Sequence, residues 1–324
     1  MRHQRDSTRR RKTGRVATAV AAIVAFAAVA VAGILHDRSA DPARTLPIHL
    51  PVIPQSYVGV YANSAPVSYG GLTAFTNATG VEPDVVMYYS GWFQSFPNGF
   101  ASTAARNGAV PLVQIDPTRV NIAKIASGHY DGYLSSYAEA VRSYHHPVIL
   151  SFGHEMNGTW YSWGDGKTPP ATFVAAWRHI VTLFRALGAR NVTWLWTVNI
   201  INDTQHGRIP SPAPWWPGSS YVNWVGIDGY YLKSSWKFAP LFGPTIGAVR
   251  KLTSDPILIA ETAAGPAAGQ PAKIADLFAG IRSYGLLGFV WFDAANTQDF
   301  RISSPAAIAA FRQGAKTTYK RPTS

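Results

Sequence analysis

Cysteine is absent from this 324-residue chain, and glutamate is nearly so, with four residues. Without disulfide bonds, a protein outside the cytoplasm must draw its stability from its hydrophobic core. The histidines do not occur at HxH or HxxxH spacing, which disfavours a metal-dependent hydrolase, and we expect neither a metal nor another cofactor. No glycine-rich phosphate turn follows any apolar segment, which weakens the case for an open nucleotide-binding sheet.

Charged residues make up only 14% of the chain, and the net charge of +12 is unevenly placed. Residues 1–15 contain seven Lys or Arg and one Asp, whereas the other 22 basic and 16 acidic residues are scattered without a basic face. Half of the excess charge is therefore confined to the terminus. We expect no nucleic-acid partner.

The basic residues 1–15 precede an uncharged stretch of twenty residues, 16–35. A helix of this length rises about 30 Å, enough to cross a hydrocarbon core, with the basic residues on the cytoplasmic side. Its length favours an uncleaved transmembrane anchor, and a cleaved signal peptide is the alternative. Either reading predicts an extracytoplasmic protein, membrane-anchored or secreted. Residues 36–54, with four prolines, are expected to be a linker.

Eight short apolar segments, rich in residues that favour strands, follow the linker. They cover residues 57–61, 85–89, 110–115, 148–152, 192–198, 225–227, 257–259 and 288–292. Because helical patterns fill most of the intervals, the chain is expected to form a single (β/α)₈ barrel over residues 55–318. A doubly wound open sheet is the alternative. Residues 319–324 are expected to be a tail.

Amphipathic helices are expected at residues 132–144, 169–187, 271–284 and 306–317. The clearest is 169–187, which has Thr168 as a candidate N-cap and ends before Gly188. Residues 199–223 contain four prolines and no helical stripe. This interval is predicted to be a long loop with at most a short helical turn.

The most informative segment begins where the strand at 148–152 ends. A glutamate, an amide and two indoles follow Gly153 closely: Glu155, Asn157, Trp160 and Trp163. A carboxyl can transfer a proton, and indole faces stack on the apolar faces of pyranose rings. The segment therefore predicts a sugar-processing site. The alternative is a loop that holds one Glu and some packing tryptophans.

A second glutamate, Glu261, ends the seventh predicted strand. Of the other two, Glu82 precedes a strand and Glu139 lies within a helix. In α/β barrels the active site lies at the C-terminal ends of the strands, so Glu155 and Glu261 are expected to face each other across the barrel mouth. Two such carboxyls are what glycoside hydrolysis requires. The alternative is that each carboxylate merely caps the next helix.

These segments resemble glycoside hydrolase family 26. The resemblance rests on HEMNGTWYSWG (154–164), VNWVGIDGYY (222–231) and the glutamate that ends the seventh strand, and it covers roughly residues 55–315. HEMNG is the most specific part of the resemblance. The resemblance implies a retaining barrel glycosidase with Glu155 as acid/base and Glu261 as nucleophile, whose carboxyls lie about 5–5.5 Å apart.

The resemblance also implies several sugar contacts. Trp160 would line the sugar site, Tyr230 and Asp228 would lie beneath the nucleophile, and Trp291 would be an aromatic platform at the end of the eighth strand. Phe292 departs from the pattern, because mannan-cleaving members can carry a polar sugar contact there. That departure leaves the identity of the sugar open.

The residues themselves suggest further roles. His154 is expected to be an orienting donor, with a general base or a metal ligand as the alternatives, and Asn157 and Trp92 are candidate substrate contacts. Trp215 and Trp216 either contact substrate or pin their loop. Apolar neighbours should raise the pKa of Glu155, and a Tyr230 hydroxyl should hold Glu261 ionised.

Together these observations predict an exported, retaining endo-glycosidase that acts as a monomer on a β-linked polysaccharide. The resemblance favours β-1,4-mannan, followed by mixed-linkage β-glucan or β-xylan. A carbohydrate-binding barrel without catalysis, and an enzyme that trims the cell's own exopolysaccharide, are the alternatives.

Overall fold

The computed structural model describes residues 50–202 and 209–319. The predicted basic segment (1–15), the hydrophobic segment (16–35) and most of the linker lie outside these ranges. Within them, no helix combines the length and apolar character needed to cross a membrane. The barrel belongs to a compact unit that starts at Ile48.

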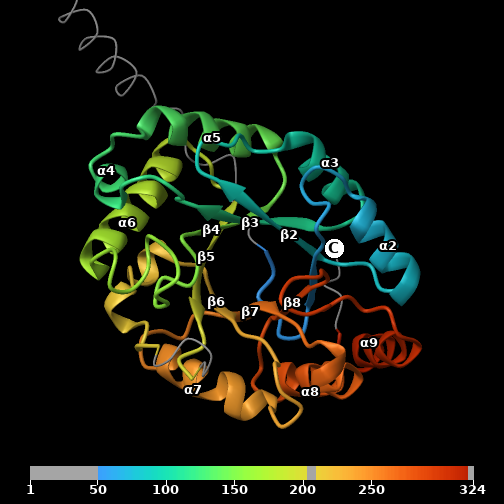
Figure 1. Ribbon diagram of the computed structural model, residues 1–324. Coiled ribbons are helices and arrows are strands. Elements are labelled where there is room, and N and C mark those ends of the chain that lie inside the picture. Colours follow the sequence, from blue (N-terminus) through green and yellow to red (C-terminus); the bar gives the residue numbers. More distant parts are fainter. Residues whose placement is uncertain (1–49, 203–208, 320–324) are drawn as a thin grey trace, which may run out of the picture. The chain divides into compact units, whose positions relative to one another are not determined.

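Eight parallel strands form a closed barrel in which each strand pairs with its neighbours in sequence and β1 pairs with β8 (Figure 1). The strands are β1 (Tyr57–Tyr61), β2 (Val85–Gly91), β3 (Val110–Asp116), β4 (Val148–Phe152), β5 (Val192–Asn199), β6 (Trp224–Asp228), β7 (Ile257–Thr262) and β8 (Gly288–Phe292). The predicted barrel is confirmed, and the open sheet is wrong.

Helices surround the barrel in Figure 1 and cover its strands from outside. They are α2 (Gly70–Thr79), α3 (Asn98–Arg106), α4 (Ile122–Ala126), α5 (Asp131–Tyr144), α6 (Pro170–Ala186), α7 (Phe238–Arg250), α8 (Gln270–Ser283) and α9 (Pro305–Thr318). The apolar stripe expected on α6 is buried, as its amphipathic pattern requires.

The loop predicted after β5 lies partly outside the described residues, at 203–208. Its described part contains two short 3₁₀ turns, η1 (Ala213–Trp215) and η2 (Ser219–Tyr221). A third such turn, η3 (Pro266–Ala268), precedes α8.

Closure of the barrel depends on a glycine at the start of β8. Gly288 has φ 154°, and a Cβ there would lie 1.8 Å from the carbonyl oxygen of Tyr57. Only a residue without a side chain allows β1 and β8 to approach this closely.

The register of β7 is irregular near its C-terminal end. Regular pairing with β6 shifts between Ile227 and Asp228, and pairing with β8 shifts between Ile259 and Thr262. Such irregularities re-aim side chains at barrel rims. Here Glu261 pairs with Asp228 and its side chain lies at the rim that carries the other candidate residues.

Candidate active site

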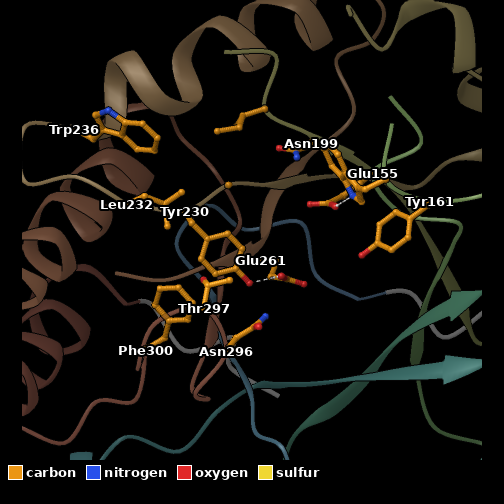
Figure 2. A pocket seen from close by; sticks show the side chains of 13 residues that line it. Glu155, Tyr161, Asn199, Tyr230, Leu232, Trp236, Glu261, Asn296, Thr297 and Phe300 are labelled. Carbon is orange, nitrogen blue, oxygen red and sulfur yellow. Dashed lines mark hydrogen bonds between the residues drawn. The ribbon is translucent and has the colours of Figure 1, made fainter. Parts of the chain in front are cut away.

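A cavity of about 310 Å³ opens at the C-terminal ends of the strands (Figure 2). Both predicted catalytic glutamates line it. The full lining is Glu155, Trp160, Tyr161, Asn199, Ile200, Gly229, Tyr230, Leu232, Trp236, Glu261, Asn296, Thr297 and Phe300. The cavity thus draws on the ends of β4 to β8, as expected for an α/β-barrel site.

Glu155 lies on an unusual piece of backbone three residues beyond β4. Gly153 and Glu155 have φ values of 56° and 54°, in the left-handed region that glycine adopts easily and glutamate rarely. The conformation is held because the Glu155 N–H donates to the carbonyl of Thr197 at 2.9 Å. Backbone held in this way directs a side chain at the cost of some strain. The Trp160 indole N–H donates to Glu155 Oε2 at 2.7 Å.

The loop that carries Glu155 is tied to its surroundings by buried polar groups. The Asn157 amide exchanges two hydrogen bonds of 2.8 Å with the backbone of Asn199, and Trp163 Nε1 donates to the His154 carbonyl at 2.8 Å. Gly158 is required here, because a Cβ at this position would lie 2.3 Å from the Trp160 ring. Asn157 is fully buried outside the cavity lining, and both ends of its amide bind the Asn199 backbone. This placement contradicts the expected substrate contact and gives Asn157 a positioning role.

Glu261 is held by two tyrosine hydroxyls from opposite sides of the barrel. Tyr230, just after β6, donates to Oε1, as the sequence predicted, and Tyr89 of β2 donates to Oε2. Burial, followed by the charge of Glu261, raises the pKa of both tyrosines well above the usual value, so both remain donors. Hydrogen bonds to a carboxylate favour its charged form.

His154 is buried beside Glu155 and forms an ion pair with the partly exposed Asp116. Its Nδ1 lies 3.0 Å from Asp116 Oδ1, and its Nε2 lies 3.1 Å from the Tyr161 hydroxyl. Burial alone lowers the pKa of His154, but Asp116, with the charges of Glu155 and Glu261, outweighs burial and raises it to about 9. The imidazole is therefore charged near neutral pH. A general base must be neutral at the working pH, so this charge favours the orienting role. No group of three or more possible metal ligands occurs in the described part of the chain.

Asp228 is fully buried at the end of β6, next to Glu261 in the barrel register. Burial, followed by the charges of Glu261 and Glu155, raises the pKa of Asp228 well above its usual range. This environment favours the protonated carboxyl. Asp228 lies beside the nucleophile position, as expected, but outside the cavity lining.

Two of the predicted aromatic contacts do not reach the cavity. Trp291 is fully buried, its indole N–H donates to the Phe300 carbonyl at 3.0 Å, and its ring packs against Phe311 of α9. Successive strand residues face opposite sides. Phe292 therefore takes the inward position and stacks on Tyr61 at 4.4 Å. The structure therefore contradicts the expected sugar platform at Trp291, because this side chain points away from the cavity.

Trp92 is 7% exposed and packs among Tyr130, Tyr133 and Phe152, away from the cavity. The structure therefore also contradicts the substrate contact expected at Trp92. Trp215 is buried, and Trp216 packs edge-on against Trp196 at 4.9 Å. Because neither lines the cavity, the structure favours the pinning of their loop over a substrate contact.

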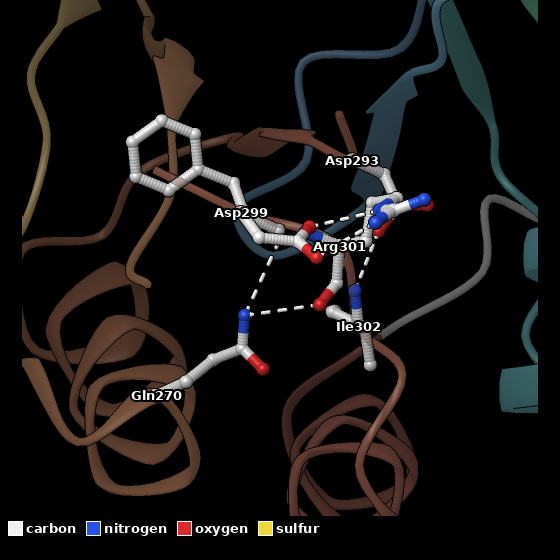
Figure 3. Close-up of polar contacts among 6 residues, drawn as sticks. Gln270, Asp293, Asp299, Arg301 and Ile302 are labelled. Carbon is white, nitrogen blue, oxygen red and sulfur yellow. Dashed lines mark hydrogen bonds and ion pairs between the residues drawn. The ribbon is translucent and has the colours of Figure 1, made fainter. Parts of the chain in front are cut away.

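The β8–α9 loop forms one wall of the cavity and contains Asn296, Thr297 and Phe300. Gln270, at the start of α8, donates to the carbonyls of Ala264, Phe300 and Arg301 at 2.8, 3.3 and 3.2 Å. Figure 3 shows this amide beneath the loop. One buried side chain thereby joins the segment after β7 to the wall formed after β8.

Several residues of the site were not predicted from the sequence. Tyr89, which binds Glu261, occupies an inward position near the end of β2, and the alternation of the strand is a signal that points to it. The loops that follow β6 and β8 contribute Trp236, Asn296, Thr297 and Phe300, and no sequence pattern marks these residues.

An α/β barrel with glutamates at the ends of β4 and β7 has the architecture of a glycoside hydrolase. The sequence profile described as Glycosyl hydrolase family 26 matches residues 120–295. The chain belongs to this family.

Two curated proteins are similar to it. Endoglucanase H of Acetivibrio thermocellus is 32% identical over 283 residues, which are 82% of this chain and 31% of that protein. Beta-1,3-xylanase of Alcaligenes sp. is 27% identical over 147 residues, which are 40% of this chain and 29% of that protein. The chain thus spans less than a third of the length of either relative.

Solved structures share the fold. The catalytic domain of an endo-beta-1,4-mannanase from Bacillus sp. JAMB-750 aligns with a TM-score of 0.64 at 14% identity, over 82% of this chain and 86% of that one. A Bacillus subtilis mannanase aligns with a TM-score of 0.60 at 15% identity, over 83% and 87%.

Proposed function

We propose that the chain is a retaining, endo-acting glycoside hydrolase that cleaves a neutral, β-linked polysaccharide. The observation that carries the proposal is the pair of unlike carboxyls in one cavity. Glu155 accepts the indole N–H of Trp160, whereas Glu261 is held by the hydroxyls of Tyr89 and Tyr230. Two carboxyls in different environments can divide the roles of acid and nucleophile.

In the first step, a Glu261 oxygen attacks the anomeric carbon while Glu155 gives its proton to the departing glycosidic oxygen. The C–O bond breaks and a glycosyl ester forms on Glu261. In the second step, the Glu155 carboxylate takes a proton from a water molecule that attacks the same carbon. The ester bond then breaks, Glu261 leaves as a carboxylate, and the configuration is retained.

The charges around the cavity support a neutral substrate. Apart from Glu155 and Glu261, the described residues that line it are apolar, aromatic or neutral polar. A uronic-acid polymer would bring its own carboxylates toward these two acids, and no described lining residue is a lysine or arginine that could pair with them. A chain of uncharged sugars fits the lining better.

Within neutral polymers, we propose β-glucan as the first substrate and β-1,4-mannan as the second. Glucosyl units in β-linkage carry their hydroxyls equatorially and present apolar C–H faces, which suit an aromatic wall such as Phe300. The 32% identical relative is named an endoglucanase. The mannanases among the structural neighbours support mannan as the second candidate.

The test is a panel of mixed-linkage β-glucan, β-1,4-mannan, glucomannan and β-1,3-xylan, with residues 45–324 as enzyme. Endo-action should reduce viscosity before many reducing ends appear, and proton NMR of the first product should show retention. An inverted product would remove Glu261 from the nucleophile role. Binding without any new reducing ends would instead favour the non-catalytic barrel.

We further propose that the domain acts outside the cytoplasmic membrane. The basic residues 1–15 precede the uncharged stretch 16–35 and should remain inside. Protease added to intact spheroplasts should digest the domain. A domain protected until lysis would contradict this topology.

A further inference from the structure

The loop between β6 and α7, residues 229–237, contributes four of the cavity residues: Gly229, Tyr230, Leu232 and Trp236. Figure 2 places Trp236 at one end of the cavity and Glu155 at the other, with Leu232 and Tyr230 between them. Trp236 is half-buried, so part of its indole faces the opening. An aromatic ring in this position is remote from the reacting carboxyls.

The turn that carries Trp236 is held from below by a buried lysine. Lys273 of α8 is 2% exposed, and its ammonium donates to the carbonyl of Ser234 at 2.7 Å and to that of Trp236. The same ammonium lies 5.8 Å from the centre of the Tyr231 ring. Burying a charge is costly unless its donors are engaged, so this ammonium binds the turn tightly.

A second side chain on the same face of α8, Asp276, binds the start of α7. Asp276 Oδ2 accepts the backbone N–H of Phe238, the first residue of α7, at 2.6 Å. Residues three apart on a helix lie on one face, so Lys273 and Asp276 act side by side. They contact the chain on both sides of Trp236 without touching the cavity themselves.

We propose that Trp236 is a stacking platform for a pyranose ring remote from the scissile bond, and that Lys273 is a positioning residue for this platform. The proposal rests on the proposed function, because it assigns a subsite to that same cleft. The platform contributes to the binding of long chains and not to the chemical step. If Lys273 served only the stability of the fold, its loss would affect short and long substrates alike.

The experiment compares Trp236→Ala, Lys273→Met and the double variant with the parent enzyme. The substrates are 4-nitrophenyl β-cellobioside, cello-oligosaccharides of increasing length and mixed-linkage β-glucan, or the matching mannan series if mannan is the substrate. Lys124→Met, at an exposed lysine of α4, is the matched control.

Each single variant should lose little on the aryl glycoside and progressively more on longer chains, through KM rather than kcat. On the polymer the loss in kcat/KM should be roughly tenfold, as expected for one aromatic contact. The double variant should lose no more than Trp236→Ala, because Lys273 acts through Trp236. Lys124→Met should behave as the parent.

Equal losses on short and long substrates, or unchanged kinetics in Trp236→Ala, would overturn the subsite. Additive losses in the double variant would overturn the positioning role of Lys273. If Lys273→Met does not fold, Asp276→Asn replaces it in the same comparison. A parent enzyme without activity on any polymer would instead overturn the proposed function, and the subsite with it.

Discussion

The two sides of the cavity hold their carboxyls by different means. On the β4 side, Glu155 stands on a loop with a left-handed backbone, beside the His154–Asp116 ion pair. On the β7 side, Glu261 lies within a strand and is held by the neutral hydroxyls of Tyr89 and Tyr230.

This difference matches the different demands of the two proposed roles. A nucleophile must stay ionised and fixed, and two hydrogen bonds to its oxygens serve both needs. An acid/base must gain and lose a proton in each cycle, and Glu155 stands on a separate loop, where it accepts the Trp160 indole N–H.

Removal of the carboxyls should give the largest effects and separate the two sides. Glu261→Ala removes the attacking atom, so hydrolysis of polysaccharide and of an aryl glycoside should both fall by several orders of magnitude. Glu155→Ala should cripple polysaccharide hydrolysis but spare the first step on an aryl glycoside, whose phenol leaves unaided. Stopped-flow absorbance should then show a burst of phenol.

Azide provides the control for this assignment, because it can occupy either vacancy. Added to Glu155→Ala it should give a glycosyl azide of retained configuration, and added to Glu261→Ala an inverted one. The reverse pattern would exchange the roles, and equal mild losses would mean that neither residue is catalytic.

Loss of the tyrosine hydroxyls that donate to Glu261 should give intermediate effects on activity. Tyr89→Phe and Tyr230→Phe each remove a hydrogen bond to a charged group, worth about 1.5–3 kcal/mol, so kcat/KM should fall roughly ten- to a hundredfold. Steady-state kinetics on the polymer measure the loss.

Trp160→Phe is the matching change on the other side, since it removes an indole N–H that donates to Glu155. It should also lower kcat/KM, because a hydrogen bond to a catalytic carboxyl is lost. A kcat/KM at the parent value in both tyrosine variants would contradict the role given to those hydroxyls.

The His154–Asp116 ion pair predicts a smaller effect, on stability. The pKa of His154 is raised from 6.5 to about 9. A raised pKa contributes stability that is complete below pH 6.5 and is lost as the pH rises through about 9. Asp116→Asn should lower the melting temperature by a few degrees at pH 6, and the difference should shrink above pH 9. His146→Asn, at an exposed histidine, is the control; a difference independent of pH would contradict the assignment.

The smallest effect is expected at the β8–α9 loop. Burial raises the pKa of Asp293 from 3.8 to about 6, although the Ile302 N–H, at 2.7 Å, and Arg301 oppose the shift (Figure 3). Its contribution to stability is complete below about pH 4 and is lost as the pH rises through about 6. Asp293→Asn should remove this dependence, a change of about one or two degrees in melting temperature. Thermal scans from pH 4 to 7 measure it, and an unchanged pH dependence would contradict it.

Errors in the predicted site come from positions where packing, not pattern, decides orientation. Trp291 and Phe292 are adjacent aromatic residues, and either could have faced the cavity. The strand alternation, with the irregular pairing of β7 and β8, turns Trp291 toward α9 and Phe292 inward. Asn157 follows Glu155 closely, yet its amide is hydrogen-bonded to the backbone of Asn199. Neither the orientation of the two aromatic residues nor the hydrogen bonding of Asn157 could be predicted from the local sequence.

The sequence by itself determined the order of strands and helices and the two strand ends that carry Glu155 and Glu261. Those features depend on local hydrophobic period and on residues next to each other in the chain. Only the tertiary structure decided that Tyr89 reaches Glu261 across 172 positions of sequence, and that Lys273 holds the turn of Trp236. Such contacts join side chains from separate elements. They arise because closure of the barrel brings the strand ends and the outer helices together, which no single segment encodes.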